Sequence, residues 1–168
     1  MEQSTLLTWM TFFPLIGMMA IIFIYGIART AGGDHERFNN IYRVIAVAAT
    51  AVPFVLALHL WRSFDPHVTG MQFVHRFVWL RAFNIEYYVG VDGISISMVL
   101  LSALISMIAV LASMPWWSEV DSHHFSKRMV PGYLAMFLLL ETGMMGVFVA
   151  ADFFLFYVFW ELMLLPMY

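Results

Sequence analysis

The chain has 168 residues, of which 62% are hydrophobic and only 11% are charged. A soluble domain has about 45–50% apolar and about 25% charged residues, so the composition excludes a soluble fold and indicates a protein embedded in lipid. The net charge of −3 comes from 8 basic and 11 acidic residues, too few and too dispersed for a phosphate-binding face, which argues against nucleic acid as a partner. Because there is no cysteine, disulfides, thiolate metal sites and iron–sulfur ligation are excluded.

Five charge-poor stretches predict an all-α, polytopic membrane helix bundle, because a spanning helix needs about 20 apolar residues. In chain order we expect helices near residues 6–28, 44–61, 93–113, 131–150 and 153–168. The first stretch is longer than the ~7–15 apolar residues of a signal-peptide core, and no basic residue precedes it, which favours a retained anchor over a cleaved signal. The fifth stretch ends without a flanking charge. We therefore expect residues 1–168 to be a single membrane domain, the N-terminal part of a longer, antiporter-like subunit.

The basic residues predict the orientation, because cytoplasmic loops carry the excess of Lys and Arg. Five of them lie between helices one and two or between helices three and four: Arg29, Arg37, Arg43, Lys127 and Arg128. The N-terminus is therefore expected on the outer side. On the same side, the run 71–90 lacks a helical period and is rich in aromatic and β-branched residues, which predicts a β-hairpin that turns near 81–84. Its Trp79, Tyr87 and Tyr88 suit the aromatic belt at the membrane surface.

Two acids inside the apolar stretches, Glu141 and Glu161, are the candidate site residues. An ionisable group in the membrane core costs at least ~2.5–3.5 kcal/mol on insertion scales, so its presence needs a reason. With a turn near Asp152, both acids lie about 14–16 Å deep, close to the middle of a ~30 Å hydrocarbon layer. The sequence thus predicts two acids at similar depth on neighbouring antiparallel helices.

The fifth helix surrounds its acid with polar groups. Tyr157 and Tyr168 share a helix face with Glu161, and Pro166 frees the carbonyl group of Leu162 beside the acid. A movable partner charge in such a place would switch the carboxyl group between holding and releasing a proton. This is the chemistry of a proton relay, with Glu161 as the main candidate and Glu141 as a possible second member.

Structural interpretations compete with this one. An intramembrane Glu can simply anchor a helix by hydrogen bonding, and this alternative stays open for both acids. The small polar stripe of helix three favours close helix packing over a water wire: Ser95, Ser102, Ser106 and Ser113. Thr142, Gly146 and Ala150 form a small-residue face on helix four, which also favours packing. His123 and His124 are interpreted as solvated loop residues, and His59 has no second axial His for a haem. We expect this chain to bind no metal and no cofactor.

Two strings resemble a known family. YYVGVDGIS at 87–95 and GVFVAADFFLFYVFWELMLLPMY at 146–168 resemble the M subunits of bacterial respiratory complex I (NADH:quinone oxidoreductase), whose mitochondrial counterpart is subunit 4 of NADH dehydrogenase. This family is similar to multi-subunit cation/proton antiporters. The resemblance implies a longer bundle with two inverted repeats and helices broken at mid-membrane.

The resemblance also implies roles for single residues. It implies that Glu161 is the acid used in proton translocation, with a Lys on a later helix as its partner, whereas Glu141 matches a position that is not uniformly acidic. Asp92 and Gly93 match a signature that looks structural. His75 stands where relatives have Glu, and the pair 77–78 stands where Val-Pro is familiar. Both departures fall in the hairpin, which the resemblance assigns to contacts with neighbouring subunits.

The first hypothesis is therefore a non-redox, proton-translocating membrane subunit of respiratory NADH:quinone oxidoreductase in the bacterial inner membrane. Its expected partners are other membrane subunits of complex I, the lipid bilayer and protons, while NADH, FMN, iron–sulfur clusters and quinone are expected in partner subunits. No catalysis is expected from this chain alone. Two alternatives remain open: a subunit of a sodium/proton antiporter complex, and a structural membrane piece whose two acids tolerate replacement by Gln.

Overall fold

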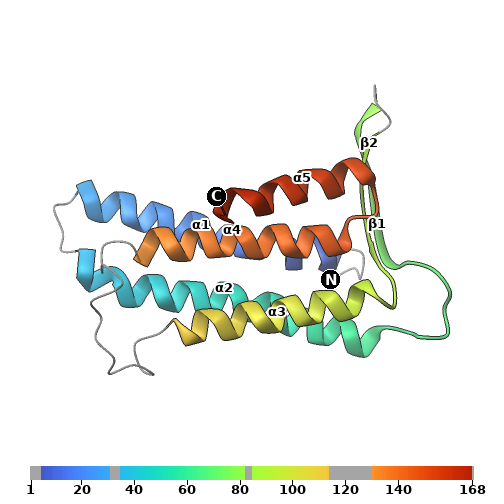
Figure 1. Cartoon of the computed structure of the whole chain (residues 1–168), viewed down its shortest axis with the longest axis horizontal. Coiled ribbons are helices and arrows are strands. Elements are labelled where there is room, and N and C mark those ends of the chain that lie inside the picture. Colours follow the sequence, from blue (N-terminus) through green and yellow to red (C-terminus); the bar gives the residue numbers. More distant parts are fainter. Residues whose placement is uncertain (1–4, 31–34, 82–84, 114–129, 168) are drawn as a thin grey trace.

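The computed structural model describes residues 5–30, 35–81, 85–113 and 130–167. The helices are α1 Leu6–Thr30, α2 His35–Ser63, α3 Ser95–Ala112, α4 Val130–Val149 and α5 Phe153–Leu164, followed by the 3₁₀ turn η4 Leu165–Met167. The strands β1 Gln72–Leu80 and β2 Ile85–Val91 form an antiparallel hairpin. Figure 1 shows α1 to α4 side by side along the long axis, α5 beside α4, and the hairpin at one end. The predicted helical membrane bundle with a hairpin between helices two and three is confirmed.

Four helices are long and apolar enough to cross a membrane: α1, α2 from Phe38 onward, α3 and α4. Their outward faces expose large apolar side chains, among them Met19 at 61%, Phe23 at 70% and Val44 at 66%. Soluble monomers rarely expose contiguous apolar surface on this scale, whereas lipid accommodates it. The chain is a multi-pass membrane protein.

The observed helix ends differ from the predicted ones where charge was used as a boundary. Helix α2 was expected over 44–61 but runs over His35–Ser63, because a helix can continue beyond the hydrocarbon layer with polar residues. Helix α5 was expected to reach residue 168, but its α-helical part ends at Leu164 and gives way to η4. Pro166 lacks the N–H group that would continue the helix, which accounts for this change. Residue 168 lies outside the described residues.

The hairpin is irregular and carries one ion pair. Two register shifts interrupt the pairing of β1 with β2, and Phe73 in the first of them has φ of 56°. The guanidinium of Arg76 pairs with the Glu86 carboxylate and lies 5.5 Å from the centroid of the Tyr88 ring. The predicted turn at 81–84 agrees with the strand ends, although 82–84 lie outside the described residues.

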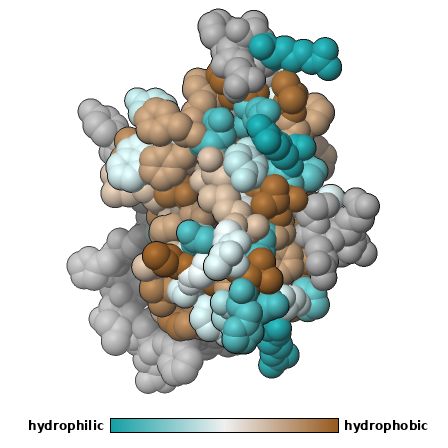
Figure 2. All heavy atoms as spheres, turned by 90° about the vertical axis from the view of Figure 1, so that its right-hand side faces the viewer, coloured by the Kyte–Doolittle hydropathy of each residue, from teal (hydrophilic) through white to brown (hydrophobic). Residues whose placement is uncertain are grey.

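The hairpin is attached to the bundle at two points. The Tyr87 hydroxyl lies 3.1 Å from Thr8 Oγ1 on α1, and the backbone N–H of Ala151 donates to the Tyr88 carbonyl at 2.9 Å. Figure 2 shows this end of the molecule, where hydrophilic side chains run between apolar ones. A mixed surface of this kind suits the boundary between lipid and water.

The bundle interior contains two apolar clusters, one near each end. The cluster at the hairpin end includes Leu7, Met10, Ala57, Leu60, Ala103 and Met145. The cluster at the other end includes Ile21, Tyr42, Ala46, Ala49, Val110 and Leu138. Between them, five fully buried polar residues come from four helices: Thr11 of α1, Thr50 of α2, Ser106 of α3, and Glu141 and Thr142 of α4. We call these five residues the mid-bundle polar layer.

Candidate functional site

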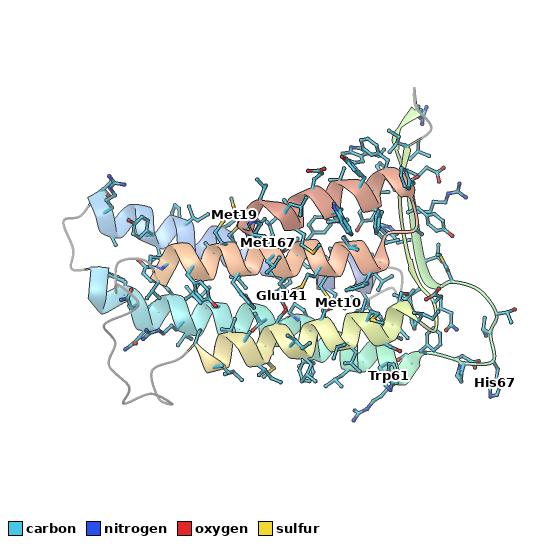
Figure 3. The ribbon with its side chains drawn as sticks, in the orientation of Figure 1. Met10, Met19, Trp61, His67, Glu141 and Met167 are labelled. Atoms are coloured by element: carbon cyan, nitrogen blue, oxygen red, sulfur yellow. The ribbon has the colours of Figure 1, made fainter. Side chains whose placement is uncertain are left out.

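Glu141 lies at the centre of the bundle. Its side chain is 0% exposed, and neither carboxyl oxygen has a hydrogen-bond partner among the described residues. Figure 3 shows it near the middle of α4, on the side of α2 and α3. A carboxyl group without partners in an apolar interior is costly, and an ionised one more so, so this arrangement calls for a proton or another partner.

Most hydroxyl groups of the polar layer do not donate a hydrogen bond to Glu141. Those of Thr11, Thr50 and Thr142 donate to backbone carbonyls of their own helices at 2.9, 3.1 and 3.0 Å. Ser106 is the exception, because its buried Oγ has no partner among the described residues. The polar layer therefore contains two side chains with unused hydrogen-bonding capacity, Ser106 and Glu141.

Glu161 has a different environment. It lies on an exposed face of α5, and its carboxylate interacts with the phenol of Tyr157 one helical turn earlier. The residues expected to share this face are also exposed, with Phe154 at 42%, Tyr157 at 52% and Leu165 at 66%. Pro166 lies within η4, one turn beyond the acid, and Tyr168 lies outside the described residues. At the start of this face the Trp79 ring of β1 packs edge-on against Phe154, with ring centroids 6.2 Å apart, while the part around Glu161 is exposed.

Two glycines set how closely α4 and α5 approach each other. A Cβ atom at Gly143 would lie 3.0 Å from the backbone nitrogen of Met163, and one at Gly146 would lie 2.2 Å from the Phe159 ring. Any larger residue at position 146 would push the helices apart. The packing interpretation of the small residues on α4 is thus supported at Gly146.

This register fixes the relation between the two acids. Since Gly143 meets Met163 and Gly146 meets Phe159, Glu161 is level with Met144 or Met145, about one helical turn (~5 Å) along the axis from Glu141. Glu141 and Gly143 are two positions apart and so point to nearly opposite sides of α4. The acids lie at similar depth, as the sequence suggests, but on opposite sides of α4, and the structure does not bring their carboxyl groups together.

Two aspartates that begin helices were not singled out as caps from the sequence. The Asp152 carboxylate accepts hydrogen bonds from the N–H groups of Phe154 at 2.9 Å and Leu155 at 3.1 Å, which fixes the start of α5. Asp92 accepts from the N–H group of Ser95 at 2.7 Å, and Ser95 Oγ accepts from the N–H group of Asp92 at 2.8 Å. These bonds hold the pKa of Asp92 below its ordinary value. The signal was present at Asp152, because Asp is a preferred residue just before a helix, whereas Asp92 lies three positions before the first residue of α3.

The remaining candidates separate by burial. Ser106 of α3 is buried but Ser113, which directly follows α3, is exposed, so the four serines do not form one packed stripe. His59 is exposed on α2. The His75 ring packs edge-on against the Tyr87 ring, with the two ring centroids 5.9 Å apart. Within the described residues, no group of three or more His, Asp or Glu side chains could hold a metal ion. His123 and His124 lie outside the described residues.

Comparison with known proteins identifies relatives over nearly the whole chain, although no protein-family model matches it. It is 31% identical over 157 residues to NADH-quinone oxidoreductase subunit M of Rickettsia typhi and 36% identical over 166 residues to subunit M of Rhodobacter capsulatus. It is 34% identical over 155 residues to NADH-ubiquinone oxidoreductase chain 4 of Arabidopsis thaliana. The three matches cover 94%, 99% and 92% of this chain but only 29%, 29% and 28% of the relatives. The chain thus spans under a third of their length.

Proposed function

We propose, on the premise that this chain belongs to the family of subunit M of NADH-quinone oxidoreductase and chain 4 of NADH-ubiquinone oxidoreductase, that it is part of a proton-translocating membrane subunit of that complex. In this proposal the chain carries no redox centre. Quinone reduction elsewhere in the complex moves charge, and that charge alters the proton affinity of an intramembrane acid. NADH, FMN, iron–sulfur clusters and quinone are assigned to partner subunits, in keeping with the absence of cysteine here.

The observation that carries the proposal is the setting of Glu161. Its carboxyl group lies on an apolar helix, beside the Tyr157 phenol and at an exposed position of that helix. A carboxyl group at this depth can exchange a proton when a cation approaches or leaves it. We assign Glu161 as the main relay, Tyr157 as a hydrogen-bonding neighbour, and Pro166 as the residue that loosens the backbone beyond it. Glu141 is assigned as a second relay member, on the bundle side of α4.

The test replaces the acid without changing its shape. In the assembled complex with a full-length subunit, Glu161→Gln is expected to abolish or strongly reduce proton pumping per quinone reduced, while the complex still assembles. Glu86→Gln, the same change in the hairpin, serves as the matched control and is expected to leave pumping unchanged. Normal pumping by an assembled Glu161→Gln complex would refute the proposal.

The proposed location is the bacterial inner membrane, with the N-terminus and the hairpin on the periplasmic side. The hairpin and the start of α1 lie at the same end of the bundle, and Arg29 and Arg43 lie toward the other end. The hairpin end carries Arg62, Arg76 and Arg81, so the orientation is supported by the sequence count of five basic residues on the opposite side against these three. Other membrane subunits of the complex are the proposed partners.

Two other functions make different predictions. A subunit of a sodium/proton antiporter complex would give sodium-sensitive growth when deleted, with normal quinone reduction. A purely structural piece would tolerate Gln at both acids. The likeness to subunits named for NADH-quinone oxidoreductase supports the first proposal over both.

A further inference from the structure

Two buried prolines lie inside the helices that pack beside the polar layer. Pro14 is in α1 and Pro53 is in α2, and both are buried. A proline inside a helix has no N–H group and crowds the carbonyl four residues earlier, so that carbonyl loses its helical partner. The carbonyl groups freed in this way belong to Met10 and Ala49. In an apolar interior such groups need another donor.

Both freed carbonyls point toward the level of Glu141. A Cβ atom at Gly17 would lie 2.4 Å from Ala49 Cβ and 3.3 Å from Leu138 Cδ1, so these three residues are level with one another. Glu141 lies one turn from Leu138 toward the hairpin end. Helix α2 runs in the same direction as α4, so the Ala49 carbonyl, which points along its helix toward the C-terminus, faces that level.

Helix α1 completes the arrangement from the other side. It runs opposite to α4, so Pro14, three residues before Gly17, is level with Glu141, and the Met10 carbonyl points toward it from the hairpin side. Ser106 of α3 lies between Ala103 of one apolar cluster and Val110 of the other, at the same level. Figure 3 labels Met10 and Glu141 close to one another along the bundle axis.

No cation is available to Glu141 at this level from the described residues. The basic residues of α2 nearest to Pro53 are His59, Arg62 and Arg43, at six, nine and ten positions, and Arg29 of α1 is fifteen positions from Pro14. Helix α3 has no charged residue, and α4 has only Glu141 itself. A carboxylate without a cation is strongly disfavoured in such a place, whereas a protonated acid can donate a hydrogen bond to a free carbonyl.

We propose that Glu141 forms a buried proton-binding site built from four helices. Its protonated carboxyl group is hydrogen-bonded, through ordered water, to Ser106 Oγ and to the carbonyl groups that Pro14 and Pro53 free. Water suits this role because it can donate to the two carbonyls and accept from the acid. The existence of the site is inferred from the packing of α1 to α4 alone. Its part in transport rests on the proposed function.

The experiment is infrared spectroscopy of the assembled complex with the full-length subunit, in H₂O and in D₂O. Glu141→Gln is expected to remove one carboxylic-acid C=O band that shifts in D₂O. Ser106→Ala and Pro53→Ala are expected to shift that band, the second because it returns an N–H donor to the Ala49 carbonyl. Ser102→Ala, one turn earlier on α3, is the matched control and should leave the band in place.

Three results would overturn the proposal. The first is a spectrum in which Glu141→Gln removes no acid band, which would mean that Glu141 is ionised. The second is an equal response to Ser106→Ala and Ser102→Ala, which would place Ser106 outside the site. The third is loss of the band when sodium chloride is added at constant pH, because the same oxygens would then bind sodium in place of a proton.

Pumping measurements keep this proposal separate from the proposed function. If Glu161→Gln pumps normally, the relay function fails, but the infrared spectra still decide whether the Glu141 site exists. If the site exists and takes part in transport, Ser106→Ala lowers pumping per quinone reduced, and Ser102→Ala does not.

Discussion

The two intramembrane acids show how differently one bundle can hold the same side chain. Glu141 is 0% exposed and has no hydrogen-bond partner among the described residues, whereas Glu161 is exposed and has Tyr157 beside it. Only about one helical turn separates them in depth, so the difference comes from the face of the helix and not from the distance to the membrane surface.

This difference indicates that the environments of the two acids are determined by different parts of the molecule. The environment of Glu141 is built by α1 to α4, so substitutions inside the bundle should alter it. The environment of Glu161 depends on how α5 is attached to α4, and on whatever covers the exposed face of α5. Substitutions at the α4–α5 contact should therefore affect Glu161 and spare Glu141.

Gly146→Ala should have the largest effect, because the new Cβ atom would lie 2.2 Å from the Phe159 ring. Overpacking of this kind costs about 1–3 kcal/mol. We expect the free energy of unfolding, measured in mixed micelles, to fall by that amount, and pumping to fall with it, while the infrared band assigned to Glu141 stays in place.

Gly132→Ala is the control for this change, since nothing lies within 4 Å of a Cβ atom at that position of α4. It should leave stability unchanged or raise it by up to ~1 kcal/mol through helix propensity. Adding Phe159→Leu to Gly146→Ala should restore part of the loss. Equal losses from the two glycine variants would contradict the close contact between α4 and α5.

Asp152→Ala should have the next largest effect, because its carboxylate accepts from two N–H groups at the start of α5. Loss of such a cap costs about 1 kcal/mol, within a range of about 0.5–2 kcal/mol. Asp152→Asn keeps an acceptor and should retain most of the stability. Thermal unfolding of the three proteins checks this, and an Asn variant as unstable as the Ala variant would count against the cap.

Much of the fold could be predicted because lipid makes simple demands. A helix must be apolar over the thickness of the hydrocarbon layer, so charge gaps located α1, α3 and α4 to within about two residues. The same rule failed at the start of α2, where polar residues from His35 onward continue the helix into water. The hairpin was visible from its lack of helical period, but its two register shifts depend on packing that no local pattern encodes.

The candidate site was predictable only in part. A charge inside an apolar span stands out in any sequence, which is why Glu141 and Glu161 could be selected. Their environments could not be read in the same way, because the face of α4 that meets α5 is decided by the contact of Gly146 with Phe159. Likewise, Ser106 is one of four similar serines on α3, and only its burial sets it apart.

Tyr87→Phe tests how the hairpin is held against the end of the bundle where α1 begins. It removes the hydroxyl that lies 3.1 Å from Thr8 Oγ1 and leaves the ring in place. One hydrogen bond of this type contributes about 0.5–1.5 kcal/mol, so unfolding should become easier by that amount. Tyr88→Phe is the control, because Arg76 contacts the ring of Tyr88 and that ring is kept. Equal destabilisation by the two variants would mean that the Tyr87–Thr8 bond does not hold the hairpin.

The smallest expected effect is a pH dependence at the start of α3. The N–H group of Ser95, and after it that of Ile94, donates to the Asp92 carboxylate and lowers the pKa of Asp92 below 3.8. The folded chain therefore binds this proton more weakly than the unfolded chain. The resulting stabilisation is complete above the unfolded pKa and is lost as the pH falls through the lower, folded pKa.

Asp92→Asn isolates this term, because the amide oxygen can still accept from the N–H groups but does not titrate. The difference in stability between the native protein and the Asn variant should stay constant from neutral pH down to about pH 4–5, and then shrink as the native carboxylate takes up its proton. Chemical unfolding at a series of pH values measures this difference. If this difference in stability stayed constant below the folded pKa of Asp92, the negative charge of Asp92 would contribute nothing to the start of α3. The start of α3 would then owe its stability to the reciprocal bond from the N–H group of Asp92 to Ser95 Oγ, at 2.8 Å.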